Sequence, residues 1–432
     1  MFTLMQSRPR NGLRTAAAGL IAAFGLAVPA LAQAPIDAAF GLELRARYEG
    51  FENNLWGGAD PADDGYLWLR ALPNAELKVG PVRGYVQLAA TQARGVGLGE
   101  GPVDTTGLDR LQSFVALSLP VADEVEITLQ GGRAFAPLGS ERLVGRRYGP
   151  NVPQAFDGGR ATVQTSRLKV DLLDLRPVAV EPGNFDDRAS RARSLRGVYA
   201  TADLGAGASL DLYWLDYAND EARFEQGRGR ERRDTYGARF FGERGGWSWN
   251  WEAMIQRGRL GDDAIAAWSV GTETGYTAAD KPMKPVMRLR ANYVSGDRDP
   301  NDDKLGTFNA LFPRGKYFGE LSPIGPYNIA NISPTLSLDL GGGVGLDLTA
   351  AAYWRASLGD GLYDVPGQLI REGADSRARF VGAQAEAAAT WRVDERLALT
   401  VSLSAFAPGR FLSESGPSDT IGMIGAEALW SF

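Results

Sequence analysis

The sequence predicts an all-β fold, a transmembrane antiparallel β-barrel of about eighteen strands, from three observations. Apolar and polar residues alternate with a period of two along most of the chain. The segments that alternate are joined by connections that are short and long in turn. The chain of 432 residues contains 54 Gly and 42 aromatic residues (Trp 10, Tyr 14, Phe 18), a composition typical of tight turns and β structure.

The clearest alternation runs from Trp247 to Gln256. One face of this segment carries Trp247, Trp249, Trp251, Ala253 and Ile255, and the other face is mostly polar. Successive side chains of a strand point to opposite faces of its sheet. A soluble sandwich would bury the apolar face in a core, whereas a membrane barrel would turn it toward lipid.

The connections favour the barrel. Eighteen alternating segments begin near residues 39, 65, 82, 109, 124, 159, 168, 195, 208, 234, 247, 264, 285, 328, 344, 380, 397 and 420. Short links lie near residues 80–81, 120–123, 165–167, 205–207, 243–245, 340–343 and 393–396. Long links cover residues 52–64, 93–108, 134–158, 177–194, 218–233, 295–327, 356–379 and 407–419, and the link 258–263 is the short exception. Short periplasmic turns and long extracellular loops are the layout of outer-membrane barrels, and a sandwich has no reason to sort its loops in this way.

The N-terminus has the pattern of a secretory signal peptide. Arg8, Arg10 and Arg14 precede an apolar run, which ends in the small-residue pattern Ala30-Leu31-Ala32. We predict a signal peptide over residues 1–32 and the barrel over residues 33–432. Cleavage after Ala34 and an uncleaved N-terminal anchor are the alternatives, but the apolar run is short for a membrane span. Together with the barrel pattern, this predicts the outer membrane of a Gram-negative bacterium.

The composition disfavours several functions. Without Cys the chain has no disulfide framework or thiol nucleophile, and without His it has no Ser-His-Asp triad and no imidazole base. We therefore predict no enzymatic activity and no cofactor. A net charge of −6 argues against nucleic acid as a partner.

The face that would line the lumen is rich in arginine, although the chain is acidic overall. The arginines of this face are Arg45, Arg47, Arg70, Arg239, Arg288, Arg290, Arg355 and Arg392. They could simply hydrate a water-filled barrel, or they could converge at a constriction and favour anions. Arg133 shares the parity of the apolar residues Val125, Ile127 and Leu129, so it reaches the lumen only if the Gly131-Gly132 pair carries a bulge or ends the strand.

Two loop segments are candidate binding sites. The basic run Arg223 to Arg233 could contact lipopolysaccharide or another polyanion, or could be a solvated loop. The segment 297–303 begins like a calcium-binding loop, with Asp297, Asp299 and Asn301 as candidate ligands, but Asp302 and Phe308 stand where such a loop requires Gly and Glu. The glycine-rich run 95–101 has no helix after it and is predicted to be an exposed loop rather than a phosphate site.

Several motifs together resemble the alginate export family of outer-membrane barrels. The longest is LGTFNALFPRGKYFGEL at residues 305–321, continuing to Asn328-Ile329 and Ser333-Pro334. Shorter matches are Gly132-Arg133, Gly139, Arg142-Leu143-Val144-Gly145, Phe156-Asp157-Gly158, residues 295–299, Tyr353-Trp354-Arg355 and Phe406-Ala407-Pro408-Gly409. The resemblance implies an eighteen-stranded barrel that exports a polyuronate through an Arg-lined lumen partly closed by loops. It also implies that Arg133 and Arg355, which match Arg-bearing motifs, contact the polyanion.

The expected function is therefore passage of an anionic polysaccharide, or of its oligomers, through the outer membrane. A general porin for small solutes is the alternative, and a barrel enzyme and an adhesion barrel are less favoured. The expected partners are the anionic polysaccharide or oligosaccharide, outer-membrane lipid and lipopolysaccharide, and the outer-membrane insertion machinery, which recognises terminal strands ending in a residue such as Phe432.

Overall fold

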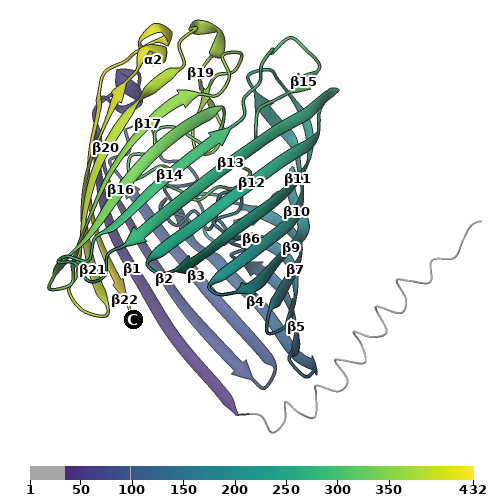
Figure 1. The fold of residues 1–432 in the computed structure, drawn as a ribbon. Helices are drawn as coiled ribbons and strands as arrows, with labels where there is room; N and C mark the ends of the chain where they lie inside the picture. Colours follow the sequence, from purple (N-terminus) through teal and green to yellow (C-terminus); the bar gives the residue numbers. More distant parts are fainter. Residues whose placement is uncertain (1–34, 98) are drawn as a thin grey trace, which may run out of the picture.

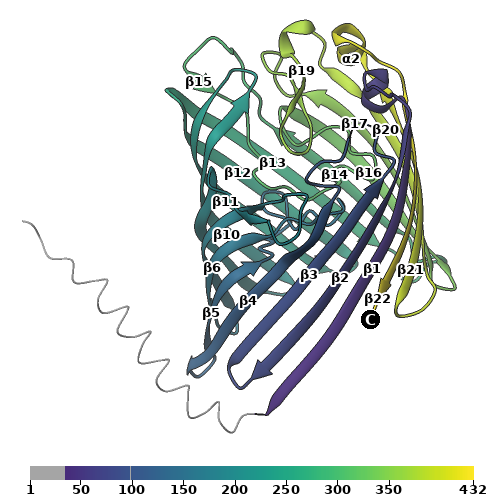
Figure 2. The same cartoon turned by 180° about the vertical axis from the view of Figure 1, so that it is seen from behind.

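The protein is a closed barrel of eighteen antiparallel strands (Figures 1 and 2). The computed structural model describes residues 35–97 and 99–432, so the predicted signal peptide, residues 1–32, lies outside the described residues. The barrel strands are β1 (Ile36–Glu52), β2 (Asp64–Val79), β3 (Val82–Arg94), β4 (Thr106–Ala122), β5 (Val125–Ala134), β6 (Phe156–Gln164), β7 (Leu168–Ala179), β9 (Arg193–Gly205), β10 (Ala208–Phe224), β11 (Gly227–Arg244), β12 (Trp247–Leu260), β13 (Asp263–Thr277), β14 (Val286–Val294), β16 (Ile329–Gly341), β17 (Val344–Arg355), β20 (Phe380–Arg392), β21 (Leu397–Pro408) and β22 (Ile421–Ser431).

Small elements decorate the long loops. They are β8 (Arg188–Ala189), β15 (Lys304–Leu305), β18 (Leu362–Tyr363), β19 (Leu369–Arg371), the 3-10 turns η1 (Asn54–Gly57) and η2 (Gly373–Asp375), and the short helix α2 (Arg410–Ser415). In the part of the chain that the structure describes, no helix is both long and apolar enough to cross a membrane.

The barrel closes between its first and last strands. Each barrel strand pairs with the next one in the chain, and β1 then pairs with β22 from Glu43↔Ser431 to Glu52↔Gly422. An even number of strands brings the start of β1 and the end of β22 to the same end of the barrel, which is also the end of the short turns (Figure 1). Closure leaves no strand edge unpaired, as a lipid environment requires.

The predicted alternation of faces is confirmed in β12. On the outer face, Trp247, Trp251 and Ile255 are 55, 45 and 47% exposed. On the inner face, Glu252 and Gln256 are 5 and 0% exposed. The apolar side chains therefore face outward, toward lipid, and the polar side chains are packed inside the barrel.

The segment 218–233, predicted as a long loop, is instead a β-hairpin. β10 continues to Phe224 and β11 begins at Gly227, which leaves a two-residue turn. Glu231 and Arg233 point inward, are fully buried and form an ion pair of 2.6 Å. Inside the barrel, Arg233 binds Gln256 and Thr307, and Glu231 accepts from Asn309, whereas the outward arginines of the segment stay exposed.

Candidate functional site

Two long loops fold into the barrel and meet inside it. The first inner loop is residues 135–155, between β5 and β6, and the second inner loop is residues 295–328, between β14 and β16. Val144 and Phe312 form a parallel bridge between the loops. The Phe312 amide donates to the Leu143 carbonyl at 2.8 Å, and the Gly145 amide donates to the Phe312 carbonyl at 2.8 Å. Figure 2 shows loop segments between opposite walls of the barrel.

The inner loops give the barrel an apolar core that its polar inner face lacks. Phe312 is fully buried and packs edge to face against Phe156 and Tyr217 of the wall, with ring centroids 5.1 and 5.7 Å apart. Phe318 packs in the same way against Tyr353 of β17 at 5.3 Å. Burial of these rings fixes the second inner loop because the apolar area removed from water stabilises only the folded-in position.

The meeting point of the loops carries three arginines. A polar cavity of about 50 Å³ is lined by Ser140, Arg142, Asn250, Glu273, Arg290, Asn292, Arg314 and Tyr317. Arg142 comes from the first inner loop, Arg314 from the second and Arg290 from β14. We name these three residues the arginine constriction.

The three arginines differ in how their charge is balanced. Arg290 is paired with Glu273 at 2.7 Å, and Arg142 with Glu252 at 2.9 Å. Among the described residues, no carboxylate pairs with Arg314, whose Nη2 donates to the Tyr317 carbonyl at 3.4 Å. Burial and, next, the charge of Arg290 lower the pKa of Arg314 from its ordinary value. Arg314 nevertheless keeps its charge at neutral pH, because the ordinary pKa of an arginine side chain lies far above 7. Among the described residues it is therefore a cation that forms no ion pair of its own, although the charge of Glu273, the partner of Arg290, also acts on it.

Glu252 on β12 holds the first inner loop in place. Its carboxylate accepts hydrogen bonds from Ser140 at 2.6 Å, Arg142 at 2.9 Å and the Tyr213 hydroxyl at 2.7 Å. Gly237, the cross-strand partner of Tyr213, leaves room for this ring, because a Cβ there would lie 2.1 Å from it.

A network of ion pairs fastens the second inner loop to the closing strands. Lys316 contacts Glu49 of β1 at 2.8 Å and Glu320 at 2.6 Å. Arg47 contacts Glu320 at 2.5 Å and Glu427 of β22 at 2.9 Å. Arg47, predicted to line the lumen, is thus an anchor for a loop that sequence periodicity could not place.

Arg45 and Arg70 hold the first inner loop in a similar way. Arg45 donates to the carbonyls of Tyr148 and Pro150 at 3.1 and 2.9 Å. Arg70 pairs with Glu43 at 2.8 Å and lies 4.3 Å from the centre of the Tyr148 ring. Both arginines are 3% exposed, so the loop covers them.

Arg239 and Arg288 are partly exposed on the inner face. Arg239 pairs with Asp211 at 2.8 Å and lies 3.8 Å from the centre of the Phe241 ring. Arg288 donates to Ser337 at 2.6 Å and lies 3.7 Å from Asp347. These two and Arg290 are the residues of the predicted set that keep contact with the lumen solvent. Arg392, at the end of β20, is exposed.

Arg355 is fully buried under the loop 356–379 rather than exposed along an open path. It makes five hydrogen bonds, to the carbonyls of Asp360, Gly373, Ser376 and Ala378. Its guanidinium also lies 4.0 Å from the centre of the Phe411 ring. Every donor of the side chain is therefore used within the protein, and contact with a polyanion stays a prediction.

Arg133 is also buried, at 2% exposure. It forms a bidentate pair with Asp157 at 2.9 and 2.8 Å and donates to the carbonyls of Arg110 and Asp187. The ladder around Gly131 and Gly132 stays in register, so no bulge is inserted there. The side chain is instead enclosed by the segment that contains Asp187.

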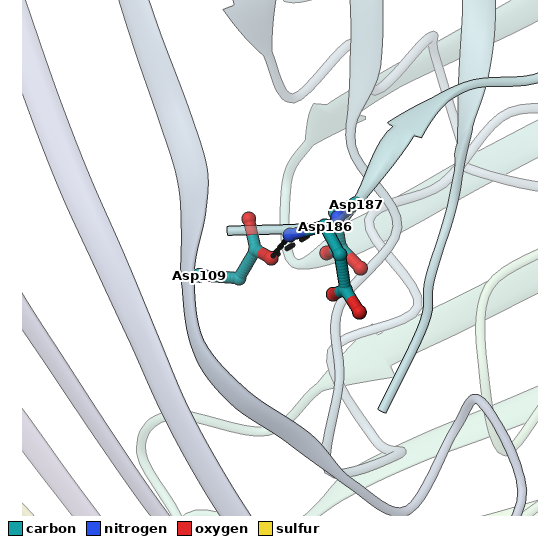
Figure 3. Close-up of side chains that lie close together, drawn as sticks. All are labelled: Asp109, Asp186 and Asp187. Atoms are coloured by element: carbon teal, nitrogen blue, oxygen red, sulfur yellow. Dashed lines mark hydrogen bonds between the residues drawn. The ribbon is translucent and has the colours of Figure 1, made fainter. Parts of the chain in front are cut away.

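Beside Arg133 lies a group of three carboxylates, from Asp109, Asp186 and Asp187 (Figure 3). One oxygen of Asp109 accepts the amides of Asp186 and Asp187 at 2.9 and 3.1 Å. Burial, and then the charge of Asp109, raises the pKa of Asp187 to about 6. The group has a structural explanation, because Asp109 caps the loop backbone and Arg133 lies 4.0 Å away.

The candidate calcium residues are used in backbone turns. Asp297 accepts the amides of Asp299 and Gly306 at 3.0 and 2.6 Å, and Asp299 accepts the amide of Asn301 at 3.1 Å. Both oxygens of Asp297 and one oxygen of Asp299 therefore accept amides of their own chain segment, and the calcium hypothesis stays a prediction.

Sequence periodicity missed Arg142 and Arg314 because both lie in loops. A signal was nevertheless present, because Arg142 begins the motif at residues 142–145 and Arg314 lies within the motif at residues 305–321. Periodicity assigns faces only within strands, whereas these motifs mark the two segments that meet inside the barrel.

The comparisons with known proteins agree with this architecture. The alginate export family matches residues 37–423. Among solved structures, OccK2 (OpdF) of Pseudomonas aeruginosa is similar with a TM-score of 0.62 at 12% identity, covering 92% of this chain and 98% of that one. OccK9 (OpdG) of the same organism has a TM-score of 0.61 at 14% identity, with coverage of 92% and 98%. A structure of OccK2 in complex with glucuronate also matches, with a TM-score of 0.61, 12% identity and the same coverage. Among curated proteins, none matches the chain. Because the family match spans nearly the whole described barrel, the chain belongs to the alginate export family.

Proposed function

We propose that this outer-membrane channel passes an anionic polysaccharide of the polyuronate class, or its oligomers, through the arginine constriction. The observation that carries the proposal is the convergence of Arg142, Arg290 and Arg314 on one polar cavity where the two inner loops meet. Guanidinium groups match the planar carboxylate of a uronate and keep their charge at any physiological pH. Arg314 is expected to contribute most to binding the polyanion, because it forms no ion pair with a carboxylate among the described residues.

The predicted arginines other than Arg392 then divide into two groups. Arg290, Arg288 and Arg239, with Arg314 and Arg142, contact the moving polyanion. Arg45, Arg47, Arg70, Arg133 and Arg355 hold loops in place, because all five are buried and bind loop carbonyls or carboxylates within the protein.

A general porin is the second candidate. It is favoured by the pairing of Arg290 with Glu273 and of Arg142 with Glu252, because paired charges hydrate a lumen without attracting anions strongly.

Single-channel recording with two matched blockers decides between them. We expect the purified channel to prefer anions over cations, and we expect a uronate oligomer to interrupt its current more often than a neutral glucan of the same length. The glucuronate complex of a structurally similar protein supports the choice of uronates as the class to test. Equal block by the two oligomers would instead favour the general porin.

The proposal also includes the expected export, membrane insertion and lipid surroundings of the protein. Residues 1–32 would be removed on export, the insertion machinery would recognise the strand that ends at Phe432, and outer-membrane lipid would surround the apolar face. No catalysis and no cofactor are required for passive passage.

Removing the Glu252 carboxylate is expected to release the first inner loop. Glu252→Ala takes away the partner of Ser140, Arg142 and Tyr213 at once, and breaking a buried ion pair costs about 3–5 kcal/mol. We expect a larger and noisier single-channel conductance, together with protease cleavage within residues 135–155. Glu243→Ala, an exposed residue of the neighbouring strand, is the control and should leave both unchanged. Wild-type conductance in Glu252→Ala would show that the loop does not narrow the path.

A further inference from the structure

The outer face of β10 to β14 carries an aromatic belt that marks one boundary of the membrane. Trp214 lies opposite Tyr236, Tyr236 opposite Ile255, and Ile255 opposite Trp268. Trp268 in turn stacks on Tyr293, with ring centroids 4.8 Å apart. These five side chains are 38–47% exposed. Aromatic side chains in such a row lie at the level where hydrocarbon meets headgroups. From Trp247 to Ile255, β12 covers roughly 26 Å along the strand, which is about 20 Å along the membrane normal once the tilt is included, most of an apolar band of about 25 Å.

Directly beyond the belt, the outward face becomes charged. The first row is balanced, because Arg196, Asp216, Asp234 and Arg257 lie opposite one another in that order across β9 to β12. The rows farther out carry an excess of arginine. Five of these arginines are exposed, and together they are called the outer arginine patch: Arg223, Arg228, Arg230, Arg232 and Arg259. In Figure 1 these strands rise toward the rim that also carries β15.

Within the outer arginine patch, like charges lie directly opposite each other. Arg232 faces Arg259 across β11 and β12, and Arg223 faces Arg228 across the β10–β11 hairpin. Among the described residues, Asp220 is the carboxylate that contacts the patch, at 2.9 Å from Arg230 and 3.3 Å from Arg232. Arg259 donates to the carbonyl of Asp262. Like charges directly opposite in a ladder destabilise the sheet. An external anion bound between the arginines would reduce this repulsion and so stabilise the folded barrel.

The height of the patch identifies that anion. Arg259 lies four residues beyond Ile255 on the same face of β12, about 13 Å along the strand and roughly 10 Å above the belt once the tilt is included. Long arginine side chains reach back toward the interface from this position. In the outer leaflet of an outer membrane, the groups found there are the phosphates of the lipopolysaccharide headgroup, which arginine binds in bidentate fashion.

We propose that the outer arginine patch is a binding site for the phosphorylated headgroup of lipopolysaccharide. Arg232 and Arg259 hold one phosphate between them, and Arg228 and Arg230 contact the same headgroup farther out, while the acyl chains lie along Trp214, Tyr236 and Ile255. The site rests on the outer-membrane barrel and not on the proposed transport function, because it lies on the outer face.

The test measures the thermal unfolding of the detergent-solubilised barrel as a function of added lipid A. Wild-type protein should be stabilised by diphosphorylated lipid A and much less by dephosphorylated lipid A. The triple variant Arg228→Gln, Arg232→Gln, Arg259→Gln should need about a hundredfold more diphosphorylated lipid A for the same shift. In the absence of lipid, this variant should be at least as stable as wild type, because the repulsion is gone.

A matched variant with Arg167→Gln, Arg244→Gln and Arg396→Gln removes three exposed arginines at the opposite end of the barrel and should respond like wild type. An equal shift with dephosphorylated lipid A, or an unchanged response of the patch variant, would overturn the proposal. A shift of the same size with inorganic pyrophosphate would assign the patch to soluble phosphates and would also overturn it. If the patch variant fails to fold, the single variant Arg259→Gln gives the same comparison by counting bound lipid A in native mass spectra. Ion selectivity should stay at the wild-type value in all variants, which separates this site from the channel.

Discussion

Replacing Arg290 and Arg314 with glutamate is expected to reverse the ion selectivity of the channel. The double substitution changes the charge at the arginine constriction by four units, in a cavity of about 50 Å³ where water screens poorly. Glu273 would then lie beside two new carboxylates. The reversal potential of single channels in a salt gradient should change sign, and block by uronate oligomers should be lost.

The control for this prediction changes the same number of charges outside the lumen. Arg167→Glu with Arg244→Glu lies at the exposed periplasmic turns and should keep the wild-type reversal potential. Equal effects of the two double variants would mean that the total charge of the protein governs selectivity. An unchanged potential in Arg290→Glu with Arg314→Glu would refute the assignment of the constriction.

The second large effect is expected from Arg355→Ala. This change leaves the carbonyls of Gly373, Ser376 and Ala378 without the donor that joins them, whereas the Asp360 carbonyl keeps a hydrogen bond from the Asn328 amide. Each unsatisfied buried acceptor costs about 1–3 kcal/mol. The loop 356–379 should detach from the barrel. Limited proteolysis of the reconstituted protein should cut within this loop, and the temperature of unfolding should fall.

Two variants show whether the geometry of the guanidinium matters. Arg355→Lys keeps the charge but cannot reach four carbonyls in one plane, so we expect it to resemble Arg355→Ala. Arg377→Ala, an exposed arginine of the same loop, should behave like wild type. A protease-resistant Arg355→Ala with altered uronate block would support direct polyanion contact by Arg355 instead of loop retention.

The strands were predictable because each strand of a membrane barrel alternates apolar outward residues with polar inward residues, and this pattern is visible in the local sequence. Every strand of the barrel begins close to a predicted position, except β11, which begins at Gly227 and not near residue 234. The error arose where charged residues occupy a strand that extends beyond the membrane. There the polar outer face no longer contrasts with the inner face, and the period of two disappears from the hydrophobic pattern.

The candidate site was predictable only in part. Arg290 was found from strand parity, and its orientation toward the lumen follows from the same alternation that exposes Met287 and Leu289. Arg142 and Arg314 escaped this reasoning because loop residues have no fixed face. The roles of Arg45 and Arg70 also could not be predicted, because their partners are carbonyls of a loop about a hundred residues away in the chain.

The sequence by itself determined the barrel, its strand number and the faces of the strand residues within the membrane band, because lipid selects apolar side chains at every second position. Only the tertiary structure decided which arginines meet at a constriction and which hold loops. That decision depends on where two long loops fold inside the barrel, and their position is set by buried aromatic rings and ion pairs between residues far apart in the chain.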